Sequence, residues 1–201
     1  MKNKKFIGLF IFVALIAFIA IKPGKANAYG LNYSKFYVAV NGGLGSTSLG
    51  SGYSTKSRGT YNISLGDNYH LNKIVVGGGV SLGYADDGSF DNNYYGNAYS
   101  ISVDSVYYAA FVKGGYDYHN ITPFVKLGYI DYAYTTSYSY AEPQYNYSGV
   151  SGVSSEGGIL YGVGVKYAFT PNWGVTAQYM GASLSSSITV NNYLIGVDYS
   201  F

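Results

Sequence analysis

Alternation of bulky apolar residues with small or polar ones is the feature that most constrains how this chain folds. Between Ile159 and Phe169, apolar side chains occupy every second position, and mostly Gly, Lys and Ala stand between them. Side chains of an extended strand point alternately to opposite faces, so this segment has one apolar face and one small or polar face. The pattern recurs in 36–45, 74–84 and 193–201, and after residue 28 no segment shows a convincing period of 3.6 residues. The sequence therefore indicates an all-β chain.

Eight strands are expected, joined alternately by short and long connections. We place them at about 35–46, 58–69, 73–85, 99–118, 121–134, 156–169, 174–184 and 192–201. The short joins lie at 71–73, 119–121 and 170–173, and the long, polar joins follow the first, third, fifth and seventh strands. An up-and-down meander with all its short joins at one end is typical of a transmembrane β-barrel.

The fourth segment does not keep one alternation. Ile101 and Val103 point to one face, whereas Val106 and Tyr108 point to the other. This change predicts a β-bulge near Asp104, or an upper half of the strand that stands clear of lipid.

The first 28 residues are expected to be a cleaved signal peptide. A basic start is followed by an apolar run from Phe6 to Ile21 and by the small residues of the triplet 26–28. Five of the twelve basic residues lie in this leader, so residues 29–201 carry seven basic and ten acidic residues, a net charge of −3. This balance gives no support to a nucleic-acid partner. The chain has no cysteine, which excludes a disulfide framework.

A soluble barrel of the lipocalin type is the competing architecture. Such a barrel packs large apolar side chains inward. Here the apolar face carries Tyr, Phe, Val and Ile, and the opposite face, rich in Gly, Ser, Asn, Lys and Asp, looks too small and polar for a hydrophobic core. An outward apolar surface of this size suits hydrocarbon and not water, and closure pairs every backbone group. Residues 29–201 are therefore expected to form an eight-stranded antiparallel up-and-down transmembrane β-barrel.

Three segments resemble the eight-stranded outer-membrane β-barrels of the OmpA/OmpX/Ail and opacity-protein kind. They are ITPFVKLGYI, VGVKYAFTPNWGVTAQY and the terminal row Tyr193, Ile195, Val197, Tyr199 and Phe201. The resemblance covers essentially all of residues 29–201, although the loops match no subgroup. It implies the outer membrane of a Gram-negative-type bacterium, with lipid and lipopolysaccharide as neighbours, and recognition of the terminal row by the outer-membrane assembly machinery. It also implies surface loops that bind a host-surface or matrix ligand.

Residues that could support catalysis are few. His70 and His119 lie at predicted short turns, where we expect solvated side chains, whereas a hydrolase acting on outer-leaflet lipid needs its histidine near the long loops. The acidic residues Asp86, Asp87 and Asp91 have no calcium-loop spacing. We therefore expect no enzyme, no cofactor and no metal site.

Charged and polar residues alternate onto the lumen side of several strands. They are Lys113, Asp117, Lys126, Lys166, Gln178 and Asp198. Counting from the short turns puts Lys166, Gln178 and Asp198 at similar depths, which predicts a hydrogen-bonded chain in that order. Because an eight-stranded barrel is just wide enough for its own side chains, a sealed polar core is favoured over a conducting pore.

Tyrosines gather in two places. Tyr138, Tyr140, Tyr145 and Tyr147 lie among Ser, Asn and Gly in the third long connection, a mixture typical of adaptable binding surfaces. A second set lies near the short turns and predicts an interfacial aromatic girdle: Tyr116, Tyr118, Tyr167, Phe169, Tyr199 and Phe201. Adhesion through the loops is the leading functional hypothesis. A structural role in envelope integrity and a lipid-modifying activity are the alternatives.

Overall fold

Eight long strands form the molecule. The computed structural model describes residues 32–49, 53–54, 58–94, 97–141, 146–184 and 188–201. The long strands are β1 (Asn32–Leu49), β3 (Arg58–Leu71), β4 (Ile74–Tyr94), β5 (Asn97–Tyr116), β6 (Ile121–Ala141), β7 (Asn146–Ala168), β8 (Trp173–Leu184) and β9 (Thr189–Ser200). The two-residue strand β2 (Tyr53–Ser54) pairs with the end of β1. The predicted signal peptide lies outside the described residues.

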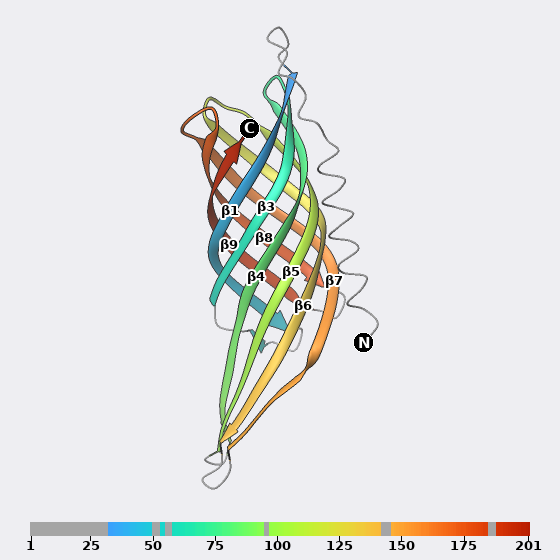
Figure 1. The fold of residues 1–201 in the computed structure, drawn as a ribbon, viewed down its shortest axis with the longest axis vertical. Helices are drawn as coiled ribbons and strands as arrows, with labels where there is room; N and C mark the ends of the chain where they lie inside the picture. The colour runs from blue at the N-terminus through green and yellow to red at the C-terminus, as the bar shows by residue number, and fades with distance from the viewer. Residues whose placement is uncertain (1–31, 50–52, 55–57, 95–96, 142–145, 185–187) are drawn as a thin grey trace.

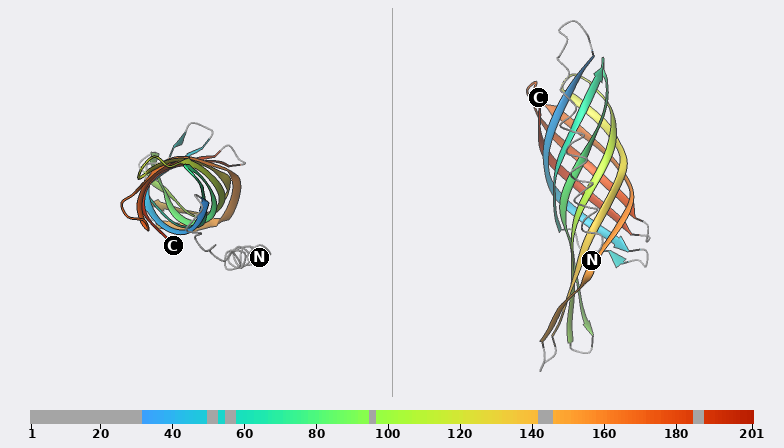
Figure 2. Two further views of the ribbon diagram at one scale, coloured as in Figure 1. Left: turned by 90° about the horizontal axis from the view of Figure 1, so that it is seen from above. Right: turned by 45° about the vertical axis from the view of Figure 1, so that its right-hand side comes forward.

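Antiparallel pairing closes these strands into a barrel. Each long strand pairs with the next, and β9 pairs back with β1 from Tyr37 opposite Ser200 to Ser48 opposite Thr189. The closed ring and the tilt of the strands are visible in Figures 1 and 2. The predicted eight-stranded antiparallel up-and-down barrel is thus confirmed. None of the described residues forms a helix long and apolar enough to cross a membrane.

The two faces of each strand follow the alternation of the sequence. On β9, Tyr193 and Ile195 are 64% and 67% exposed on the outside, whereas Leu194 between them is 2% exposed in the lumen. The other strands present similar outward rows of Val, Ile, Leu and Tyr. The outer surface of the barrel is therefore a continuous apolar band, the surface that hydrocarbon requires.

The short turns agree with their predicted positions. β3 and β4 are joined at Asn72 and Lys73, and Asn72 has a φ of 57°. His119, in the turn between β5 and β6, has a φ of 58°. Both angles lie in the left-handed region that Asn and His tolerate better than most residues.

Four strands continue far beyond the predicted boundaries. β4 and β5 pair as far as Tyr94 opposite Asn97, and β6 and β7 pair as far as Ala141 opposite Asn146. The prediction that 86–97 and 135–155 are irregular loops was therefore wrong. Their Ser, Gly, Asn and Tyr residues lack the pattern of a half-buried strand, but the backbone pairing continues past the point where one face is buried. β4 to β7 form a tapering extension beyond the barrel rim (Figures 1 and 2).

The predicted β-bulge lies on a neighbouring strand. β5 pairs with β6 without a register shift around Asp104. The shift occurs in β4 between Asp86 and Gly88, opposite Asp104 and Val103. This irregularity marks the level at which the extension leaves the barrel, since the last β3 partner of β4 is Thr60, opposite Ala85.

The lumen is apolar in one half and polar in the other, which corrects the expectation of a wholly small and polar inner face. Towards the extension, a buried cluster closes the barrel: Ala85, Tyr107, Ala109, Phe111, Ile130, Tyr132, Leu160, Met180, Ala182, Leu184, Val190 and Leu194. Tyr107 and Tyr132 stack with ring centroids 5.0 Å apart. Alternation along a strand marks two faces but does not say how far a residue lies along the barrel axis, so these inward apolar residues were not recognised as one cluster.

Candidate functional site

The polar half of the lumen holds a cavity of about 400 Å³ near the short turns. Every long strand except β4 contributes at least one polar or charged residue to its lining. Its charged residues are Lys35, Lys113, Lys126, Lys166, Asp117 and Asp198. The cavity also reaches turn residues such as His119, Asn120 and Asn172. It therefore extends to the short-turn rim of the barrel, while the apolar cluster lies at its other end.

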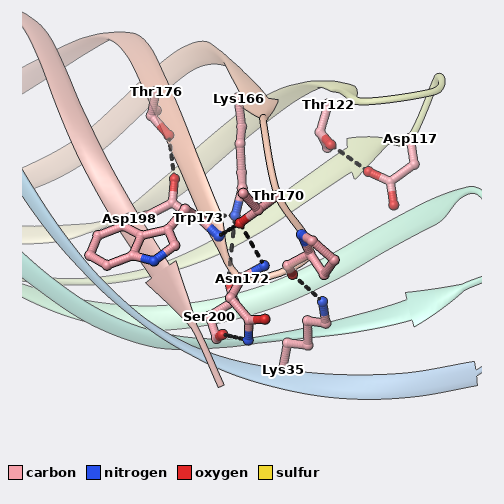
Figure 3. Close-up of polar contacts among 11 residues, drawn as sticks. Lys35, Asp117, Thr122, Lys166, Thr170, Asn172, Trp173, Thr176, Asp198 and Ser200 are labelled. Atoms are coloured by element: carbon pink, nitrogen blue, oxygen red, sulfur yellow. Dashed lines mark hydrogen bonds and ion pairs between the residues drawn. The ribbon is translucent and has the colours of Figure 1, made fainter.

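An ion pair between Lys166 of β7 and Asp198 of β9 lies in this half of the lumen (Figure 3). Asp198 is 4% exposed, and its Oδ1 accepts a hydrogen bond from Thr176 Oγ1 at 3.1 Å. The intervening strand β8 places Gly174 opposite Asp198. A Cβ at Gly174 would lie 2.7 Å from Lys166 Cε, so the absent side chain leaves room for the pair.

Gln178 makes a different contact from the one expected. Its Oε1 accepts a hydrogen bond from Lys126 Nζ at 3.0 Å, and Lys166 reaches Asp198 directly. The register explains the difference, because Lys166 lies opposite Thr176 whereas Gln178 lies opposite Gly164, one inward position farther from the turn. Thr176, which the sequence analysis did not single out, therefore takes the place beside Asp198.

A second polar group surrounds Asp117. Its Oδ2 lies 2.9 Å from His70 Nδ1, and its Oδ1 accepts a hydrogen bond from Thr122. Figure 3 shows Thr122 turned towards Asp117. His70 is half-buried in this group, which corrects the expectation of a solvated turn residue, whereas His119 is exposed at its turn. Both histidines lie at the short-turn end, and the described residues contain no group of three or more side chains able to hold a metal ion.

Lys113 and Lys126 are direct neighbours across β5 and β6. Lys113 Nζ lies 4.5 Å from the ring centroid of Tyr37 and 5.3 Å from that of Phe124. Lys126 Nζ lies 4.1 Å from the ring centroid of Phe111. Aromatic faces attract cations, so both ammonium groups rest against ring surfaces at the border between the polar and the apolar half.

The tyrosines of the predicted third loop lie on paired strands. Tyr138 and Tyr140 belong to β6 and Tyr147 belongs to β7, with Tyr140 opposite Tyr147. Tyr145 lies outside the described residues. Asp86, Asp87 and Asp91 lie on β4, where the extension begins and continues.

The terminal row of β9 joins an aromatic group at the short-turn end. The rings of Tyr199 and Phe201 lie 4.9 Å apart, and Tyr199 is 4.9 Å from Trp173. The backbone N–H of Phe201 donates to Phe36 O at 2.9 Å. Trp173 and Phe36 were missed in the sequence, although the position of Trp173 directly after a short turn was a usable signal. The outward residues predicted as a girdle lie near these ends of the strands: Tyr116, Tyr118, Tyr167 and Phe169.

Comparisons with known proteins agree with this architecture. A family model described as "Outer membrane protein beta-barrel domain" matches residues 10–201. The fold is similar to that of Ail, the attachment invasion locus protein of Yersinia pestis (16% identity, 84% of this chain and 99% of that chain covered, TM-score 0.53). It is also similar to Ail in complex with the heparin analogue sucrose octasulfate (17%, 84% and 99%, 0.50). A major outer membrane protein from Thermus thermophilus gives 15%, 84% and 99%, and 0.53. None of the curated proteins matches the sequence.

Proposed function

The chain belongs to the outer membrane protein β-barrel domain family, and from this premise we propose that it is a non-enzymatic surface protein whose β4–β7 extension binds host or extracellular factors. As a member of this family it is located in the outer membrane of a Gram-negative-type bacterium. In such barrels the short turns face the periplasm and the long connections face outward. The extension is then the part of the described structure that reaches farthest from the cell.

The two free edges of the extension carry this proposal. β3 ends its pairing with β4 at Ala85, and β8 ends its pairing with β7 at Gly158. Beyond these points, among the described residues, Asp86–Tyr94 of β4 and Asn146–Gly157 of β7 have a paired neighbour on one side only. An unpaired edge presents backbone N–H and C=O groups that can pair with an extended segment of another chain. The extension thus offers two docking edges outside the membrane.

The composition of the extension supports the same role. It contains Tyr138, Tyr140 and Tyr147 among Ser, Gly and Asn residues. Tyrosine supplies a large contact area with little loss of conformational entropy, and the small polar residues supply adaptable hydrogen bonds. Ail of Yersinia pestis, an attachment and invasion protein, has a similar fold. A lipid-modifying activity gains no support, because both histidines lie at the opposite end of the barrel from the outer leaflet.

Shortening the two hairpins tests the proposal. Replacing 87–103 with Asn-Gly joins Asp86 to its partner Asp104, and replacing 136–152 with Asn-Gly joins Thr135 to its partner Val153. We expect the shortened protein to insert normally and cells carrying it to lose attachment to host cells or matrix. A matched variant keeps both hairpins and replaces Tyr138, Tyr140 and Tyr147 with Thr. Unchanged attachment after shortening would contradict the proposal, and detergent sensitivity without loss of attachment would favour a role in envelope integrity.

A further inference from the structure

The cavity at the periplasmic end carries an excess of positive charge. Its lining contains four lysines and two aspartates, a net charge of +2 with neutral histidines. Both aspartates already have partners in the lumen: Asp198 pairs with Lys166 and accepts from Thr176, and Asp117 contacts His70 and accepts from Thr122. The carboxylates therefore balance only part of the positive charge that faces the cavity.

Lys113 and Lys126 are the lysines with the least compensation. They occupy directly opposite positions on β5 and β6, where like charges destabilise a sheet. Within the described part of the chain, neither ammonium lies within 4.0 Å of a carboxylate. Lys126 is 8% exposed and donates one hydrogen bond, to Gln178, although an ammonium has three donors. Lys113 has ring faces as its contacts, so both side chains keep donors available.

We propose that Lys113 and Lys126 form a binding site for a small oxyanion, with inorganic phosphate as the simplest case, which enters the barrel from the periplasm. An oxyanion held between two ammonium groups accepts their unused donors and replaces repulsion by charge-assisted hydrogen bonds. The cavity of about 400 Å³ exceeds the needs of such an ion and is comparable to small-molecule pockets. The apolar cluster closes the far end, so the site is a blind pocket. This site does not depend on binding by the extension.

Unfolding of the protein in detergent tests the site directly. Phosphate is titrated against chloride at constant ionic strength, and the unfolding temperature is read from the shift between folded and unfolded migration on a gel. A ligand that binds only the folded state raises this temperature in a saturable manner. We expect saturation with the unchanged protein and with Lys73→Met, a matched control at an exposed turn outside the cavity. Lys113→Met and Lys126→Met should each bind phosphate about tenfold more weakly, and the double variant should show no saturable shift.

A second measurement needs no variant. The detergent-solubilised protein is treated with an amine-acylating reagent, and modification of each lysine is followed by mass spectrometry. Phosphate should slow the acylation of Lys113 and Lys126 and leave that of Lys73 unchanged. Protein in vesicles that contain phosphatidylglycerol but no free phosphate distinguishes a lipid headgroup as the source. Protection only in those vesicles, no protection in either arm, or an equal thermal shift in the double variant would each overturn the site.

Discussion

The side chain of Lys166 on β7 pairs with that of Asp198 on β9 across the intervening strand β8. The pair spans β8 at Gly174, where the absence of a side chain leaves the space that the lysine occupies. In the polar half of the lumen, the fit between neighbouring strands thus depends on glycine as well as on charge.

Replacing Asp198 with Asn should destabilise the barrel. The change leaves the Lys166 ammonium beside a neutral amide in a largely buried position, which costs on the order of 3 kcal/mol in free energy of unfolding. Urea titration of the protein in detergent measures the change. Single-channel conductance in a planar bilayer should stay near zero, because the apolar cluster still closes the lumen. An unchanged free energy of unfolding would contradict the structural role of the pair.

Replacing Gly174 with Ala should weaken the same pair by steric means. The new Cβ would lie 2.7 Å from Lys166 Cε and 3.0 Å from Asp198 Oδ1. Overpacking of this kind costs about 1–3 kcal/mol. Gly114 is the matched control, since a Cβ there meets no atom within 4 Å. Equal stability of the two variants would show that the space at Gly174 is not needed.

Truncation of Leu160 should both destabilise and loosen the barrel. Leu160 is fully buried in the apolar cluster, so Leu160→Ala should lower the free energy of unfolding by about 2–5 kcal/mol. Ile159 precedes it on β7 and is 61% exposed on the outer face, so Ile159→Ala should cost much less. Combining Leu160→Ala with Phe111→Ala should raise conductance above that of the unchanged protein. Equal losses for Leu160 and Ile159 would show that the cluster is not a packed core.

The terminal Phe201 should act in assembly more than in stability. Phe201→Ser removes the terminal aromatic that we propose as the recognition signal, so the amount of folded protein in the outer membrane should fall. Phe36→Ser removes the ring that lies 5.8 Å from that of Phe201 and leaves the terminus intact. Cell fractionation and refolding in detergent compare the two variants. Equal amounts in the outer membrane would argue that Phe201 acts through the ring contact alone.

The sequence predicts the faces of the barrel better than its contents. Alternation placed Ile195 and Val197 on the outer surface and Asp198 inside, because a strand has only two faces. Counting from the short turns brought Lys166 and Asp198 to a common depth, since antiparallel register is set by the turn. The same counting misplaced Gln178 by one inward position, because the register at the turn between β7 and β8 was not known to the residue.

The extension and the apolar cluster could not be derived from residue patterns. The segments around Asp91 and Tyr140 carry no apolar face, so neither periodicity nor burial marks them as strands, and their pairing comes from continuation of the hairpins. The cluster of Ile130, Leu160 and Leu194 depends on which heights three separate strands share, and only the closed register supplies that information.

The central claim is that hydrocarbon contacts the outer row of each strand while the inner row is enclosed. The chain has no cysteine, so a single introduced cysteine can carry a spin label without competition. Labels at 193, 195 and 197 of β9, in protein reconstituted into vesicles, should collide with dissolved oxygen far more often than with a water-soluble nickel complex. Labels at 194, 196 and 198 should be shielded from oxygen. Equal access of the nickel complex to the outer row would contradict the account.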